Sequence, residues 1–117
     1  MNNKEFAKSL ELRTLNFSIE IINLSVSLPK MPESLVIRNQ ITKSGTSIGA
    51  NYREANRSRS KKDFKNKIKI SESEASETNY WLEIIEALNW IDKEKLKPVK
   101  QESKELLAIF TSIANKL

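Results

Sequence analysis

The chain has 117 residues, with 20 Lys and Arg against 15 Asp and Glu, and it contains neither Cys nor His. These counts exclude a Cys or His nucleophile, a His general base, a zinc site built from thiolates or imidazoles, and a disulfide framework. No apolar run approaches the ~20 residues that a membrane span needs, and the first residues lack the apolar segment of a signal peptide. We therefore expect a cytoplasmic protein of one domain, residues 1–117, without membrane association, metal or cofactor.

Residues 3–28 predict a first helix with two apolar faces. At spacings of three and four, one stripe consists of Phe6, Leu10, Phe17, Ile21, Leu24 and Leu28, and the other of Leu15, Ile19, Ile22 and Val26. A helix that is apolar on two sides needs a partner on each side, from its own chain or from another copy. Pro29 and Pro32 end this helix, because proline removes a hydrogen-bond donor and disfavours helical geometry in the residue before it.

A second helix is predicted to begin at Pro32 or Glu33, since proline suits a first turn and an acid there interacts favourably with the helix dipole. Its periodic positions are Ile37, Ile41, Ser44, Ile48, Tyr52 and Ala55. The small residues of segment 44–50 allow a neighbouring backbone to approach closely. The alternative for this segment is a phosphate-binding loop through its two glycines, but it lacks the Gly-x-x-x-x-Gly-Lys spacing, and the helical period continues through it.

Residues 56–60 interrupt the pattern, and Ser60 with Asp63 predicts the capped start of a third helix. Its main stripe consists of Phe64, Ile68, Ser71, Ala75, Thr78, Leu82, Ile85 and Asn89. A second face, about 100° away, consists of Ile70, Glu74, Glu77, Trp81, Ile84 and Leu88. The third helix therefore also has two faces to bury.

Residues 92–95 are predicted to form a turn, with Pro98 in the first turn of a fourth helix. The stripe of this helix consists of Leu96, Val99, Ser103, Leu106, Phe110, Ile113 and Leu117. Four helices with near-heptad stripes and short connections predict an all-α fold, an antiparallel up-down-up-down four-helix bundle. A long coiled coil is disfavoured, because the breaks limit each stripe to about three heptads.

Charge is distributed unevenly along the chain. Residues 30–69 hold 11 Lys and Arg against three acids, whereas residues 70–94 hold one base against seven acids. We expect contact with RNA or DNA through a basic arc that consists of Arg53, Arg57, Arg59, Lys61, Lys62, Lys65 and Lys69. Such contact releases counterions and makes binding salt-sensitive; the alternative is a solvated face that confers only solubility. Phe64, the one aromatic residue here, is assigned to the core, so little base stacking is expected.

Glu74 and Glu77, three residues apart, are candidates for metal binding or acid–base chemistry. Di-iron bundles pair such acids with His, which the chain lacks, so we interpret both as structural partners of Arg38, Arg53 or Arg57. The first and third helices carry more apolar surface than one bundle absorbs, which predicts a homo-oligomer. Its expected interface consists of Ile70, Glu77, Trp81, Ile84 and Leu88.

Residues 46–55, 60–64 and 74–82 resemble the four-helix bundle protein family, most specifically in segments 47–54 and 77–82. Its members are also called intervening-sequence proteins, because some are encoded within insertions in bacterial 23S rRNA genes. The sequence is also similar to the accessory protein of diversity-generating retroelements. In some members a Gly-rich turn follows the second helix, where this chain has Ala55 and Asn56.

The resemblance implies a ring-like homopentamer, no catalytic residues, and RNA or DNA and a reverse transcriptase as partners. By motif position it also implies a structural polar network of Arg38, Asn51, Glu54 and Glu77. We therefore favour a small, oligomeric, non-enzymatic protein that binds RNA or DNA. The alternative is an interaction scaffold for a reverse transcriptase or a ribosomal component, without direct contact to nucleic acid.

Overall fold

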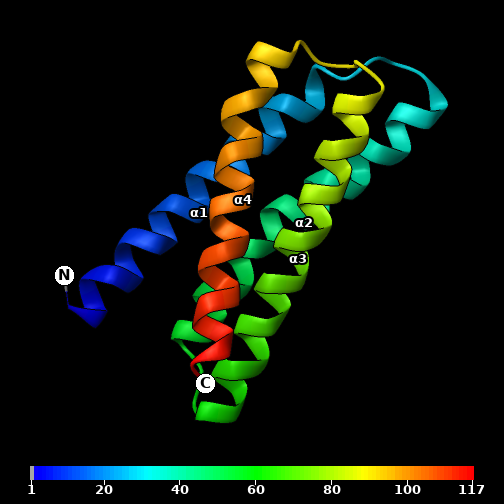
Figure 1. The fold of residues 1–117 in the computed structure, drawn as a ribbon. Helices are drawn as coiled ribbons and strands as arrows, with labels where there is room; N and C mark the ends of the chain where they lie inside the picture. The colour runs from blue at the N-terminus through cyan, green and yellow to red at the C-terminus, as the bar shows by residue number, and fades with distance from the viewer. Residues whose placement is uncertain (1) are drawn as a thin grey trace.

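The structure, a computed structural model, describes residues 2–117 as four α-helices in an antiparallel bundle (Figure 1). The helices are α1 (Asn3–Val26), α2 (Pro32–Asn56), α3 (Lys61–Ala87) and α4 (Lys93–Asn115). Each helix packs against the next along the chain, and α4 closes the bundle by contacting α1. The predicted all-α four-helix bundle is confirmed, with overall dimensions of 44 × 26 × 21 Å.

Side-chain caps and a left-handed residue set several helix ends. The Asn2 side chain accepts a hydrogen bond from the Glu5 amide at 2.8 Å, and Ser60 accepts one from the Asp63 amide at 3.0 Å, as predicted for the start of the third helix. Asn89 has a φ of 56°, a geometry that asparagine tolerates better than most residues. It lies beyond the end of α3, so its placement in the stripe of that helix is wrong.

The predicted start of the fourth helix is also wrong. Asp92 is the N-cap residue, and its carbonyl oxygen accepts hydrogen bonds from the amides of Lys95 and Leu96 at 3.0 Å each. Residues 93–95 are therefore helical, and Pro98 lies in the second turn. A proline there removes the hydrogen bond to the carbonyl of Glu94, a residue exposed to solvent.

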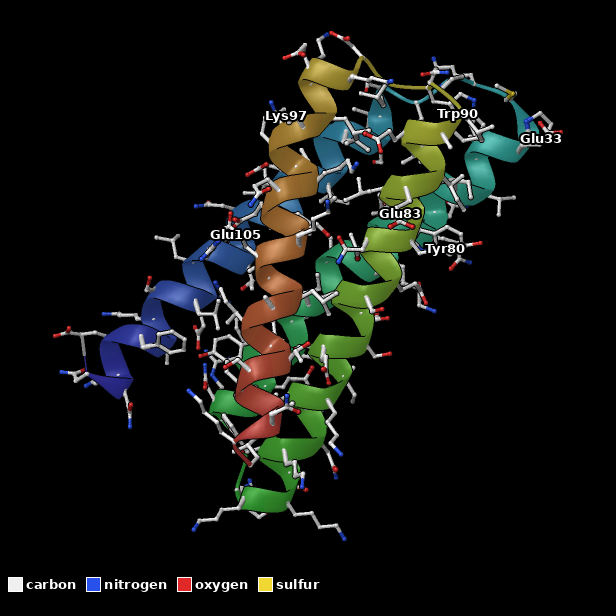
Figure 2. The ribbon with its side chains drawn as sticks, in the orientation of Figure 1. Glu33, Tyr80, Glu83, Trp90, Lys97 and Glu105 are labelled. Carbon is white, nitrogen blue, oxygen red and sulfur yellow. The ribbon has the colours of Figure 1, made fainter. Side chains whose placement is uncertain are left out.

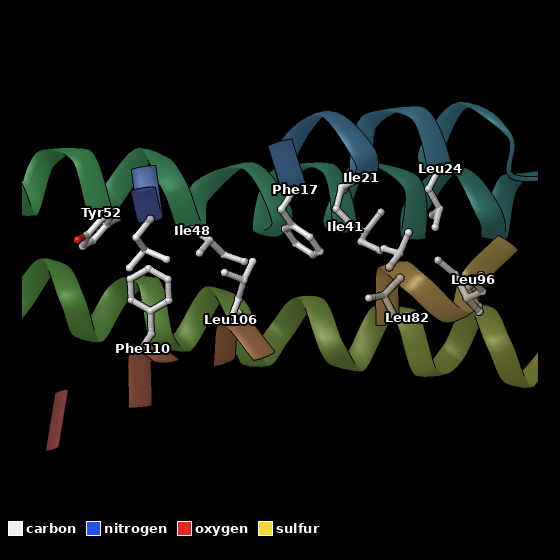
Figure 3. Packing of buried hydrophobic residues seen from close by; sticks show 14 of the residues in the cluster. Phe17, Ile21, Leu24, Ile41, Ile48, Tyr52, Leu82, Leu96, Leu106 and Phe110 are labelled. Carbon is white, nitrogen blue, oxygen red and sulfur yellow. The ribbon is translucent and has the colours of Figure 1, made fainter. Parts of the chain in front are cut away.

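The core extends along the bundle and receives side chains from all four helices (Figure 3). Tyr52 and Phe110 pack edge to face, with ring centroids 5.4 Å apart. The predicted stripes account for most of the core, but Phe6 and Leu117 are 42% and 49% exposed. Ala114 is buried near the end of α4, where Ile113 is only half-buried. At this end of α4, the buried side chain is therefore that of Ala114, one residue after the predicted Ile113.

Segment 44–50 is helical throughout, which confirms the helix and rules out the alternative of a phosphate-binding loop. Its glycines contact α1 directly. A Cβ atom at Gly45 would stand 2.8 Å from Cγ2 of Ile21, and one at Gly49 would stand 2.8 Å from Oγ1 of Thr14. Gly45 and Gly49 therefore allow α1 to pack closer to α2 than any larger side chain would permit.

The second apolar stripe of α1 lies on the surface. Leu12, Leu15, Ile19, Ile22 and Val26, which we call the α1 stripe, are 42 to 57% exposed. They follow spacings of 3, 4, 3 and 4, the pattern of a helix–helix seam. No helix within residues 2–117 has a segment long and apolar enough to cross a lipid bilayer.

One arginine of α1 forms the ion pairs between α1 and α4. Arg13 donates from Nε and Nη2 to the two Glu102 carboxylate oxygens at 2.7 Å and to Glu105 at 2.8 Å. These contacts raise the pKa of Arg13, and hydrogen bonds from Gln101 and Arg13 lower that of Glu105. The first turns of α1 then diverge from the last turns of α4 (Figure 1).

We predict that Gly45→Ala destabilises the protein, although Ala favours helix more than Gly by about 1 kcal/mol. The added methyl group would overlap Ile21, and overpacking of this kind costs about 1–3 kcal/mol. Urea denaturation measures the change. Asn39→Ala, at an exposed position of α2, is the control and is expected to leave stability unchanged or slightly higher. A Gly45→Ala protein more stable than the parent would show that glycine does not limit this helix contact.

Candidate nucleic-acid interface

The basic arc gathers at the end of the bundle where α2 connects to α3. Arg53 lies in the last turn of α2, Arg57 is its C-cap residue, and Arg59 lies in the connection. The four lysines of the arc lie in the first three turns of α3. The structure thus brings the seven residues to one region, largely because they are close in sequence.

Ion pairs divide the cations of this region into two groups. Arg53 faces Glu11 of α1, with 3.9 Å between Nε and Oε1, and Lys67 donates to Glu54 at 2.9 Å. Within residues 2–117, the other six members of the arc form no ion pair; they are Arg57, Arg59, Lys61, Lys62, Lys65 and Lys69. Their charges are therefore available to a partner.

The connection between α2 and α3 borders a hollow of about 460 Å³. Its lining consists of Glu54, Arg57, Ser58, Arg59, Asp63, Asn66 and Lys67. Lys67 pairs with Glu54, so the charged lining residues without an ion pair in residues 2–117 are Arg57, Arg59 and Asp63. We call this the turn hollow.

The lysines at the start of α3 oppose the field of their own helix. The N-terminus of a helix carries a partial positive charge, and a cation there is unfavourable by about 0.3–1 kcal/mol. Lys61, Lys62 and Lys65 all lie in the first two turns, where Asp63 is the only acid. Helix stability therefore does not explain this concentration of positive charge.

The predicted oligomer interface on α3 is partly exposed. Ile70 and Leu88 are 42% and 52% exposed, and Glu77 is also exposed. Trp81 is half-buried and donates from Nε1 to Glu77 at 3.2 Å, while its ring packs on Tyr80, which Figure 2 labels on the outer side of α3. We call Ile70, Glu77, Trp81, the half-buried Ile84 and Leu88 the α3 face, in which Glu77 separates Ile70 from the other apolar residues.

The structure does not bring the predicted polar network together. The Asn51 side chain donates to the carbonyl of Ser47 at 2.9 Å, Glu54 binds Lys67, and Glu77 binds Trp81. Among residues 2–117, no hydrogen bond joins any two of the four proposed members, and neither Glu74 nor Glu77 pairs with an arginine. A role for these residues between copies of the chain stays a prediction.

The described part of the chain also shows no group of three or more carboxylates placed to hold a metal ion.

A second basic surface on α4 was missed by the sequence reasoning, which compared charge only as far as residue 94. Lys93, Lys97, Lys100 and Lys104 follow spacings of 4, 3 and 4 and share one face of the helix (Lys97 is labelled in Figure 2). Lys100 donates to Glu86 of α3 and, with the nearby charges of Lys93 and Lys104, lowers the pKa of that carboxylate. The helical spacing of lysines was the signal that would have revealed it.

An all-α bundle with a basic end, and with exposed apolar side chains on α1 and α3, defines a small four-helix bundle protein. The chain belongs to the 23S rRNA-intervening sequence protein family, which matches residues 9–112. It is similar to a crystal structure from Bacteroides thetaiotaomicron VPI-5482, described as a protein with unknown function from the S23 ribosomal protein family. That likeness has a TM-score of 0.82 and 38% identity, and it covers 89% of this chain and 96% of the other. No curated protein matches the chain.

The family predicted from the residues is thus confirmed, and the similarity to the retroelement accessory protein stays a prediction.

We predict that Ser60→Ala lowers stability by about 1 kcal/mol, because an amide at the start of α3 loses its acceptor. Thermal unfolding followed by circular dichroism measures the effect. Ser60→Asp keeps a cap acceptor and is expected to match the parent, and Ser73→Ala, at an exposed position within α3, controls for helix propensity. Equal stability of Ser60→Ala and the parent would contradict a stabilising cap at the basic end.

Proposed function

We propose that the chain is a small, oligomeric, non-enzymatic protein that binds RNA or DNA through the phosphates. The observation that carries this proposal is the group of six cations at one end of the bundle without ion pairs inside the described chain. A polyanion offers such cations partners, and the release of its counterions favours binding. The lysines that oppose the dipole of α3 gain most from an anionic partner.

Contact of this kind positions a nucleic acid without reading its bases. Phosphate contacts fix register and orientation but carry little sequence information. The arginines of the turn hollow, Arg57 and Arg59, lie where a backbone can pass over the connection. We therefore expect binding that depends on charge and shape, and we expect it to take place in the cytoplasm.

The non-enzymatic part of the proposal rests on the side chains present. The sequence has neither His nor Cys, so the commonest general base and the thiol nucleophile are absent. The hydroxyl groups of the bundle mostly bind carbonyl groups of their own helices, as Thr14 and Thr46 do. This arrangement supports a binding protein rather than a catalyst.

The oligomeric part of the proposal rests on two apolar surfaces at opposite corners of the bundle. Within the described residues, α1 and α3 do not contact each other, so the α1 stripe and the α3 face point in different directions. A symmetric dimer through one surface would leave the other in water. Packing of the α3 face of one copy on the α1 stripe of the next covers both, and such head-to-tail contacts form a ring when the rotation between successive copies closes. The resemblance to the family implies five copies.

We predict that replacing Arg57 and Arg59 by Gln weakens binding to duplex DNA and structured RNA and reduces its salt dependence. Loss of two phosphate contacts lowers the slope of log affinity against log salt by about 1.8 on a duplex. Fluorescence anisotropy at several salt concentrations measures both changes. The matched control removes the same charge at the other end of the bundle, with Lys30→Gln and Lys95→Gln, two exposed residues. Equal losses in both double variants would indicate that net charge alone controls binding.

We predict that Ile19→Glu on the α1 stripe and Ile70→Glu on the α3 face each prevent ring formation. Sedimentation velocity of the parent is expected to show an oligomer and each variant a monomer. A mixture of the two variants keeps one intact α1 stripe and one intact α3 face, so it is expected to form dimers and no larger species. Ala108→Glu, at an exposed position of α4, is the control. A monomeric parent at micromolar concentration would contradict the ring.

A protein scaffold is the second candidate function, and the exposed apolar surfaces are the observation that favours it. Contiguous apolar patches on soluble proteins mark interaction sites. If the parent is monomeric and binds no nucleic acid, these surfaces become the binding sites for another protein. A reverse transcriptase or a ribosomal component is the partner that the family resemblance implies.

A further inference from the structure

A second hollow lies at the basic end of the bundle, where the C-terminus comes beside the start of α3 (Figure 1). It measures about 570 Å³, within the range of about 300–1,000 Å³ that is usual for small-molecule sites. Its lining consists of Lys61, Lys62, Phe64, Lys65, Lys116 and Leu117. We call it the Phe64 hollow. Building on the proposed function, we propose that it binds an unpaired nucleobase of a single-stranded nucleic acid.

The apolar part of the hollow suits the face of a base. Phe64 is only half-buried, so one part of its ring packs on the core and another part lines the hollow. Leu117, which is 49% exposed, adds an aliphatic surface. Bases stack on aromatic side chains whatever their identity, because every base has a π face. The hollow therefore accepts a base without selecting its sequence.

The polar part of the hollow suits the phosphates on either side of that base. Four lysines line the hollow together with Phe64, and within residues 2–117 none of them forms an ion pair; they are Lys61, Lys62, Lys65 and Lys116. Long lysine side chains cover apolar surface with their methylene groups and keep the ammonium group in water. An aromatic side chain beside several cations without ion pairs is the combination that binds single strands.

The turn hollow lacks this combination. It contains Glu54 and Asp63 and no aromatic side chain. A phosphate backbone can contact the arginines of the turn hollow, but no aromatic ring lines it on which a base could stack. A strand that crosses the connection between α2 and α3 would thus meet phosphate contacts at the turn hollow and a base site at the Phe64 hollow.

The inference predicts that the protein prefers unpaired bases to paired ones. Three labelled probes of equal length separate the contributions in anisotropy measurements: oligo(dT), an abasic strand with the same phosphates, and duplex DNA. The parent is expected to bind oligo(dT) about tenfold more tightly than the abasic strand, as one or two stacked bases allow. Equal affinity for these two strands would overturn the inference and leave the proposed phosphate binding intact. Absence of binding to all three probes would overturn both.

Substitutions at Phe64 give the second readout. Phe64→Leu keeps an apolar side chain but removes the π face, so it is expected to abolish the preference for oligo(dT) and to leave the affinity for the abasic strand unchanged. Phe64→Tyr retains an aromatic ring and is expected to retain the preference. Circular dichroism checks that both variants fold. If Phe64→Leu binds oligo(dT) as tightly as the parent does, the Phe64 ring is not the stacking platform. If Phe64→Leu does not fold, the comparison of the three probes with the parent protein tests the inference instead.

Discussion

The distance between α1 and α2 is the constraint on which the arrangement of the bundle depends. Gly45 and Gly49 leave no room for a Cβ atom beside Ile21 and Thr14, so α1 rests on the backbone of α2 itself. Interiors are packed too densely for this contact to loosen without cost. With α1 held to α2 in this way, its contact with α4 is less extensive and includes the Arg13 ion pairs, and its first turns diverge from α4.

This placement of α1 explains why the isolated chain exposes so much apolar surface. The side of α1 that faces α2 is buried, whereas the α1 stripe on its other side stays exposed within residues 2–117. The α3 face lies at the opposite corner and is uncovered for the same reason, since each corner helix of a four-helix bundle has only two neighbours. In the proposed oligomer, a second copy would supply the missing contacts.

The basic end of the bundle has an excess of unpaired positive charge rather than of exposed apolar surface. Here the sequence places lysines where the dipole of α3 disfavours them, and the folded chain gives them few acidic partners. Residues that are unfavourable for the stability of their own helix or strand are common at functional sites. The same end holds two hollows of different character, one between charged groups and one against Phe64. Charge and an aromatic platform thus lie within the first turns of a single helix.

The sequence by itself determined the helices, most of their ends and the side of each that is buried, because helical periodicity, prolines and caps such as Ser60 act over a few residues. It also located the basic arc, whose members are neighbours along the chain. Only the tertiary structure decided which cations remain unpaired, since the partner of Arg53 is Glu11, on another helix. It alone placed Phe64 at the edge of the core: periodicity assigns a residue to a side of its helix, whereas the neighbouring helices decide how far it is covered.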